Sequence, residues 1–192
     1  MNPSQNPSAI RSKTEITETL LRLMGQYPYT EISVKHILLE TPISRKTFYR
    51  NFSSKDDVLS SYIDTIMLQY MGVLENMGHY RMLLLFDVIF QFCELHKDFL
   101  KQLRDNHLLY MLLEKWNQLL PIMHEQIIKN KIEGEPIQDK LLTEYVIAFN
   151  VGAVWNMMVK WLENDMQESI ENVKATMTDY LMHINELDLR WI

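Results

Sequence analysis

The chain has few of the features that mark secreted, membrane-spanning or metal-binding proteins. It holds a single cysteine, Cys93, so it can form no internal disulfide and offers no cysteine pair for zinc. No uncharged apolar run approaches the ~18 residues that a membrane-spanning helix needs. Residues 1–8 are polar and lack the apolar segment of a signal peptide. We therefore expect a cytoplasmic protein in which Cys93 is a buried small side chain.

The usual sequence signatures of catalysis are also missing. The chain has five glycines, and they form neither a Gly-rich phosphate loop nor a nucleophile elbow. Its six histidines include no i, i+4 pair and no His-Glu-x-x-His motif. We therefore expect no enzyme activity, no catalytic residue, no cofactor and no metal site.

What the chain does contain is apolar sequence that favours helices. Apolar residues make up 47 % of it, and 13 methionines accompany only six prolines. Gly78 and the segment 131–137 indicate breaks, and Pro121 should kink or split the helix that contains it. The pattern predicts an all-α fold of about nine helices, near residues 10–25, 30–40, 44–52, 55–76, 80–95, 97–105, 107–130, 138–164 and 169–187.

The short helix near residues 44–52 carries the most informative pattern of the sequence. Three basic residues, Arg45, Lys46 and Arg50, lie on it. Phe48 and Phe52, four residues apart, give the helix one apolar side that can dock on a core. A helix anchored on one side and basic on the other suits a polyanion, although a solvated charged face is the alternative reading of any basic cluster.

Two further helices precede this one in the order of a helix-turn-helix. Ser33 or Thr30 can cap the helix just upstream, and Pro42 breaks the chain after it because proline disfavours an α conformation in the preceding residue. Ser44 can then cap the basic helix. An apolar helix over residues 10–25 can close the core from behind. The sequence therefore predicts a three-helix DNA-binding head whose second helix-turn-helix element enters the major groove.

The net charge of −6 hides a basic segment. Residues 1–60 carry eight Lys/Arg and six Asp/Glu, whereas residues 61–192 carry 11 and 19. Residues 33–55 alone hold five basic residues and one acid, Glu40. Because attraction to phosphate decays over about 8–10 Å in physiological salt, a basic module can bind DNA despite an acidic body. We therefore expect double-stranded DNA as a partner.

At this point the sequence resembles the TetR family of transcriptional regulators. The order of elements over residues 10–75 and the string Thr-Phe-Tyr-Arg-Asn-Phe-Ser-Ser-Lys at residues 47–55 carry the resemblance. Residues 152–155, residues 161–165 and Ser169 resemble the regulatory domain of a subgroup that includes the dihydroxyacetone-kinase operon activator.

The resemblance and the helical pattern together predict how the chain is divided. A flexible arm, residues 1–9, precedes a helix-turn-helix domain, residues 10–54. A connecting helix, residues 55–76, leads to a helical regulatory and dimerisation domain, residues 77–192. The resemblance implies a homodimeric regulator, most often a repressor, that binds a palindromic operator and responds to a small-molecule effector of unknown identity.

The candidate DNA-binding residues follow from position and from the resemblance. Ser44, Arg45 and Lys46 lead the basic helix and could reach base edges, with arginine preferring guanine. The resemblance places Thr47 and Tyr49 on backbone phosphates, a task that suits hydroxyl groups.

Two lysines outside this helix are further candidates. Lys55, at the start of the connecting helix, would bring its charge and nearby backbone amides to another phosphate. Lys35, in the preceding helix, could contact the groove or a phosphate. Arg50 could instead pair with a neighbouring acid.

The turn departs from the family pattern at two points. The family commonly has a small residue, a glycine and an aliphatic residue in the turn, where this chain has Thr41, Pro42 and Ile43. Proline cannot adopt the positive φ that glycine allows, so the turn must differ locally. Leu38 also replaces a residue that is usually alanine.

Two further sets of residues are predicted in the connecting helix and the C-terminal domain. Apolar and small residues at helical spacing form a candidate dimer interface, for which an internal core face is the alternative: Phe149, Gly152, Ala153, Asn156, Val173, Met177, Tyr180 and Leu181. Inward-facing apolar residues form a candidate effector site, for which ordinary core packing is the alternative: Met67, Tyr70, Phe86, Phe90, Met111, Trp116 and Phe149.

A different function stays open, in which the C-terminal domain binds a protein coregulator and the protein activates transcription.

Overall fold

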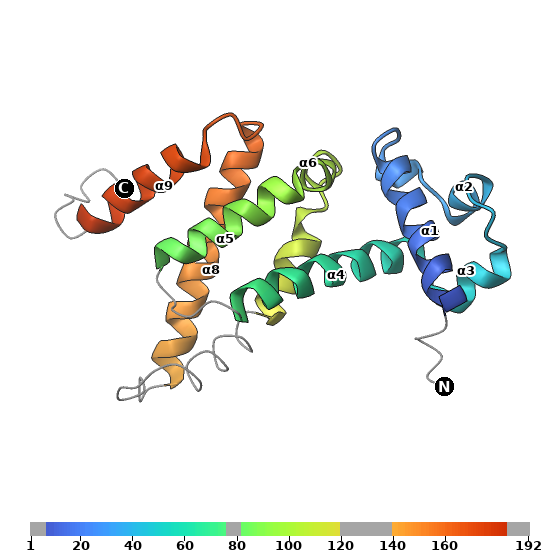
Figure 1. Ribbon diagram of the computed structural model, residues 1–192, viewed down its shortest axis with the longest axis horizontal. Coiled ribbons are helices and arrows are strands. Elements are labelled where there is room, and N and C mark those ends of the chain that lie inside the picture. The colour runs from blue at the N-terminus through green and yellow to red at the C-terminus, as the bar shows by residue number, and fades with distance from the viewer. Residues whose placement is uncertain (1–6, 76–81, 120–139, 184–192) are drawn as a thin grey trace. The chain divides into compact units, whose positions relative to one another are not determined.

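The computed structural model describes residues 7–75, 82–119 and 140–183 of the chain (Figure 1). Within these ranges the chain is helical and contains no strand, which confirms the predicted all-α fold and its nine helices. Gly78, Pro121 and the segment 131–137 lie outside the described residues. The helices are α1 (Pro7–Met24), α2 (Val34–Leu39), α3 (Arg45–Asn51), α4 (Lys55–Glu75), α5 (Met82–Leu95), α6 (Lys97–Asp105), a helical segment at 109–119, α8 (Lys140–Glu163) and α9 (Ile170–His183), with a 3-10 turn η2 (Tyr29–Glu31) before α2.

The chain forms two compact units. The first comprises Met1–Gln69 and Gln102–Trp116, and the second comprises Tyr70–Lys101 and Asn117–Ile192. Residues 102–116 therefore pack with the N-terminal helices, although the expected domain boundary assigned them to the C-terminal part. An ion pair of 2.9 Å between Lys115 and Asp64 of α4 is one of the contacts that hold them there.

Helix α1 closes the core of the first unit. It begins at Pro7, three residues earlier than expected, because the fixed φ of proline suits the first turn of a helix. Ile16, Leu20 and Leu23 recur at helical spacing and are almost completely buried. Through this face α1 packs against α2 and α3.

The predicted apolar side of α3 is also buried. Phe48 has no exposed surface and Phe52 is 4 % exposed, with their rings 6.2 Å apart. Ile37 of α2 and Leu59 of α4 are fully buried in the same unit. Burying an aromatic side chain contributes roughly 1.5–3 kcal/mol, so the two phenylalanines are the main anchor of this seven-residue helix.

The second unit is built on α5, which packs against α8 and α9. The rings of Phe90 and Trp161 meet edge to face at 5.0 Å, and Cys93 is fully buried as predicted. The turn after α8 contains two consecutive residues with positive φ, Asp165 and Met166.

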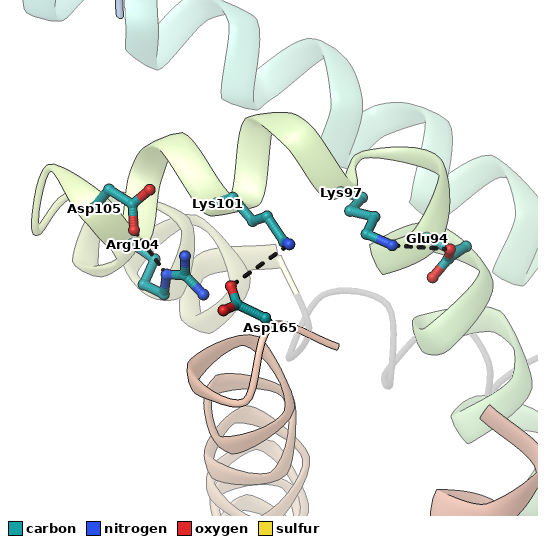
Figure 2. Close-up of polar contacts among 6 residues, drawn as sticks. All are labelled: Glu94, Lys97, Lys101, Arg104, Asp105 and Asp165. Atoms are coloured by element: carbon teal, nitrogen blue, oxygen red, sulfur yellow. Dashed lines mark hydrogen bonds and ion pairs between the residues drawn. The ribbon is translucent and has the colours of Figure 1, made fainter. Parts of the chain in front are cut away.

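Surface ion pairs on α6 extend this packing (Figure 2). Lys101 pairs with Asp165 at 3.5 Å, and Lys97 pairs with Glu94 of α5 at 3.6 Å. Both pairs are partly exposed, so each contributes little stability on its own and mainly orients the helix end.

Candidate nucleic-acid interface

The start of α3 is fixed by a side-chain cap. The hydroxyl of Ser44 accepts a hydrogen bond of 3.2 Å from the backbone amide of Thr47, as the sequence predicted for a helix N-cap. The hydroxyl groups of Ser44 and Thr47 also lie 2.9 Å apart. The first turn of α3 is thus ordered by its own side chains, and both hydroxyl groups already have a partner within it.

The outward side of α3 is basic and exposed. Arg45, Lys46, Tyr49 and Arg50 are all exposed, whereas Thr47 is half-buried. The guanidinium carbon of Arg45 lies 5.6 Å from the centroid of the Tyr49 ring, within cation–π range. This side therefore presents three cations and a phenol, and two of the cations, Arg45 and Lys46, lie in the first turn of the helix.

The one acid of this segment is paired elsewhere. Glu40 accepts from the guanidinium of Arg22 on α1 at 3.2 Å, and its backbone carbonyl accepts from the same group at 3.4 Å. Because Glu40 is held by α1, its charge is compensated by Arg22 and does not draw on the cations of α3.

The turn between α2 and α3 accommodates its proline without a left-handed residue. Ser33, one of the two predicted caps, accepts from the amide of His36 at 3.1 Å, whereas Thr30 lies in η2. Glu40 ends α2 with φ −100° and ψ 5°. The residues with positive φ in the described chain are His107, Asp165 and Met166. The turn therefore differs locally from a glycine-containing one, as its sequence requires.

Lys55 has partners within the protein itself. Its ammonium donates to the carbonyls of Tyr29 at 2.5 Å and Ile32 at 2.6 Å, and it lies 4.2 Å from the centroid of the Tyr29 ring. Burial lowers the pKa of Lys55, and the nearby Asp56 carboxylate partly opposes that shift. Lys55 therefore ties the start of α4 to the segment before α2, a role that its sequence position did not indicate.

Tyr29 is the centre of these contacts. Its hydroxyl donates to Asp56 at 2.6 Å, and its backbone amide donates to the side chain of Asn106 at 2.6 Å. Tyr29 is 6 % exposed, and burial, followed by the hydrogen bond to Asp56, raises its pKa well above the ordinary value. Sequence reasoning missed Tyr29 and Asn106, because a lone tyrosine and a distant asparagine form no recognisable motif.

The seven candidate DNA-binding residues all lie in the first unit. The structure brings Ser44 to Thr47 and Arg45 to Tyr49 within α3. Lys35 is exposed on α2. A residue not among the candidates, Lys13 of α1, lies 5.7 Å from the ring of Phe52 and adds another exposed cation beside α3.

The candidate dimer residues lie on α8 and α9 in the second unit. Phe149 is 70 % exposed and Tyr180 is 42 % exposed, which is unusual for aromatic side chains that serve a core. A Cβ atom added at Gly152 would meet nothing within 4 Å among the described atoms. Ala153 and Asn156 are exposed, Val173 and Met177 are half-buried, and the side chain of Leu181 lies outside the described residues.

The candidate effector residues are divided between the units. Met67 and Trp116 are buried in the first unit, where Met111 is half-buried. Tyr70 and Phe90 are buried in the second unit, and the ring of Tyr70 lies 5.3 Å from that of Phe92. Phe149 is exposed, and the side chain of Phe86 lies outside the described residues.

Two other types of site are absent from the part of the chain that the structure describes. None of the described helices combines the length and the hydropathy that a membrane span requires. No group of three or more His, Cys, Asp or Glu side chains stands close enough, in the same residues, to hold a metal ion.

Comparisons with known proteins agree with this arrangement. The family model described as "Bacterial regulatory proteins, tetR family" matches residues 16–62, and the one described as "Transcriptional regulator C-terminal region" matches residues 81–183. A solved structure, the dihydroxyacetone kinase operon activator DhaS, is similar with a TM-score of 0.55 and 18 % sequence identity, covering 90 % of this chain and 95 % of that chain. At that identity the likeness shows a shared fold. No curated protein matches the chain.

Proposed function

Because the chain belongs to the TetR family of transcriptional regulators, we propose that it binds a palindromic operator as a homodimer, represses transcription there and is released by a small-molecule effector. The observation that carries the proposal is the capped helix α3, which is anchored by Phe48 and exposes Arg45, Lys46 and Tyr49. The protein acts where the bacterial chromosome lies, in the cytoplasm.

The candidate DNA-binding residues at the start and along α3 have distinct tasks in this proposal. Arg45 and Lys46 read base edges in the major groove, with Ser44 at the helix start beside them. Thr47 and Tyr49 bind backbone phosphates and set the register of the helix on the duplex. Since phosphate contacts act on any sequence and base contacts on only one, the first pair governs specificity and the second governs general affinity.

Lysines beyond α3 extend the phosphate-binding surface. Lys35 on α2 contributes a solvent-exposed cation. The ammonium of Lys55 is occupied by two carbonyls, so its segment would act chiefly through the N-terminus of α4, where the helix dipole and backbone amides favour an anion.

A homodimer through α8 and α9 would supply two heads for two half-sites. The exposed Phe149 and Tyr180 and the open space at Gly152 support this choice, because a second copy could cover the aromatic rings and approach the glycine closely. The proposed interface also includes Ala153, Asn156, Val173, Met177 and Leu181. Half-site centres would then lie about 34–36 Å apart, or at a multiple of that distance.

Control by an effector would act through α4, which continues from the first unit into the second. Ligand binding in the first unit, at Met67, Met111 or Trp116, or in the second unit, at Tyr70, Phe86, Phe90 or Phe149, would shift α4, including its start at Lys55. Coupling on the order of 1–3 kcal/mol would change operator affinity by roughly 5- to 150-fold. By linkage, operator DNA must weaken ligand binding by the same factor.

A second candidate function is transcriptional activation through a protein coregulator bound to the C-terminal domain. This candidate is supported by the similarity to a solved structure that is named as an operon activator. One measurement on the purified protein distinguishes the two functions. A small molecule that binds the protein is titrated in the presence and in the absence of operator DNA. Weaker ligand binding in the presence of operator supports effector control, whereas equal binding refutes it and favours the coregulator.

A further inference from the structure

Tyr49 and Arg45 form a cation–π pair on the exposed side of α3. They are four residues apart, which places them one above the other on the helix, and the guanidinium carbon lies 5.6 Å from the ring centroid. Both side chains are exposed, so the contact is not forced by burial in a core. The contact restricts an arginine that leads the helix and would otherwise sample many rotamers.

The ring of Tyr49 is itself held in place. It meets the ring of Phe48 edge to face, with centroids 5.3 Å apart and planes at 77°. Phe48 is fully buried and anchors α3 in the core of the first unit. An aromatic contact therefore runs from the core through Phe48 to Tyr49 and on to Arg45.

A ring beside the guanidinium suits a base-reading arginine because this group is planar. When one face of this planar group lies on a ring, the N–H donors at its edge stay free for the O6 and N7 acceptors of guanine. Restricting the side chain before binding also reduces the rotamer entropy that is lost on contact. The hydroxyl group of Tyr49 is not needed for either effect.

We propose that Tyr49 is a positioning residue for sequence reading: its ring holds Arg45 for one base pair, while its hydroxyl separately binds a phosphate. This inference rests on the proposed function, in which Arg45 reads a base edge. The two parts of the Tyr49 side chain then have different effects. The ring affects discrimination between DNA sequences, and the hydroxyl affects binding to all sequences.

The test uses the full chain and two DNA duplexes, the selected operator and the same duplex changed at the base pair where Arg45→Ala relaxes selection. Discrimination is the Kd for the changed duplex divided by the Kd for the selected operator, both measured by fluorescence anisotropy. Tyr49→Phe should weaken both duplexes alike and leave the ratio unchanged. Tyr49→Leu should lower the ratio by about 2- to 5-fold, the range expected for an exposed cation–π contact.

Two controls make the effect specific. In the Arg45→Ala background, Tyr49→Leu should leave the ratio unchanged, because the arginine that it positions is gone. Arg50→Ala, which removes another exposed cation from the same helix, should not alter the ratio at this base pair. Circular dichroism on each variant checks that the head is folded, and Tyr49 at 48 % exposure should tolerate replacement.

The outcomes of this test distinguish the positioning role of Tyr49 from the proposed function on which it rests. An unchanged ratio in Tyr49→Leu, with weaker binding to both duplexes, would overturn the positioning role alone and leave Tyr49 as a phosphate contact. A wild-type protein that selects no DNA sequence would overturn both the positioning role and the proposed function.

Discussion

The side chain of Asn106 accepts a 2.6 Å hydrogen bond from the backbone amide of Tyr29, a residue 77 positions earlier in the chain. Asn106 follows the last residue of α6, and Tyr29 begins the turn η2 that precedes the helix-turn-helix. Tyr29 also holds Asp56 and Lys55 at the start of α4. The start of η2 is therefore held by Asn106, a residue that the sequence analysis assigned to the regulatory domain.

We expect Asn106→Ala to destabilise the first unit. The substitution removes the acceptor for the Tyr29 amide, and an unsatisfied buried donor costs about 1–3 kcal/mol. Asn106→Asp is the matched control, because it keeps an acceptor oxygen at the same position. Urea unfolding of the full chain measures the free energy of unfolding. Equal loss in the two variants would show that this hydrogen bond is not the cause.

Stability should fall at alkaline pH in a way that depends on Tyr29. Its folded-state pKa is raised above the ordinary value of 10.0, so the folded chain holds this proton more tightly than the unfolded chain. The stabilisation is fully present below pH 10 and is lost as pH rises toward the folded-state pKa. Lys55, whose pKa is lowered from 10.5, acts with the opposite sign over part of this range.

The Tyr29→Phe variant isolates this effect. Tyr62 and Tyr70, whose pKa values burial also raises, are present in both proteins, so their contribution cancels in the comparison. The wild-type free energy of unfolding should fall more steeply between about pH 10 and 11.5 than that of the variant. Parallel curves for the two proteins would contradict the role assigned to the buried hydroxyl.

Substitutions at Ser44 can distinguish its role in capping α3 from its role in DNA binding. Ser44→Ala should destabilise the head by about 0.5–2 kcal/mol because α3 loses its N-cap. Ser44→Asn and Ser44→Asp should both keep the cap, but the aspartate adds a negative charge where a phosphate or base edge would lie. Thermal unfolding should rank the two close together, while operator affinity should fall much further for Ser44→Asp. Similar affinities would place Ser44 away from the DNA.

The dimer proposal is tested at Gly152. Among the described residues nothing lies within 4 Å of a Cβ atom added there, so Gly152→Leu should leave the helix intact and act only through a partner. Gly72→Leu on α4 is the control, because a Cβ atom added at Gly72 also meets nothing within 4 Å among the described atoms. Light scattering at micromolar concentration should show a dimer for the wild type and control and a monomer for Gly152→Leu. A monomeric wild-type protein would refute the proposal.

Local features were predictable from the sequence because local rules decide them. The cap at Ser44 and the buried pair Phe48 and Phe52 follow from spacing within a single short helix. The choice of Ser33 over Thr30 as the cap of α2 did not follow, because both residues suit the position and the turn η2 decides between them.

Other features depend on contacts that spacing cannot reveal. A lysine at the start of α4 could face DNA or the carbonyls of a neighbouring turn, and Lys55 takes the second option because Tyr29 and Ile32 lie beside it. Phe149 fits a helical apolar stripe whether it faces a core or a partner chain, and its 70 % exposure favours the partner. The link between Asn106 and Tyr29 joins two segments that share no motif.

The most direct test of the account is a selection of bound sequences from a random DNA library with the full-length protein, repeated with Arg45→Ala. We expect the wild type to enrich one palindrome with half-site centres about 34–36 Å apart or a multiple of that, roughly one helical turn per step. We expect Arg45→Ala to relax the preference at one position of each half-site, with a loss of about 1–3 kcal/mol there. No enriched sequence from the wild type, or the same motif from both proteins, would contradict the central claim that α3 reads the operator.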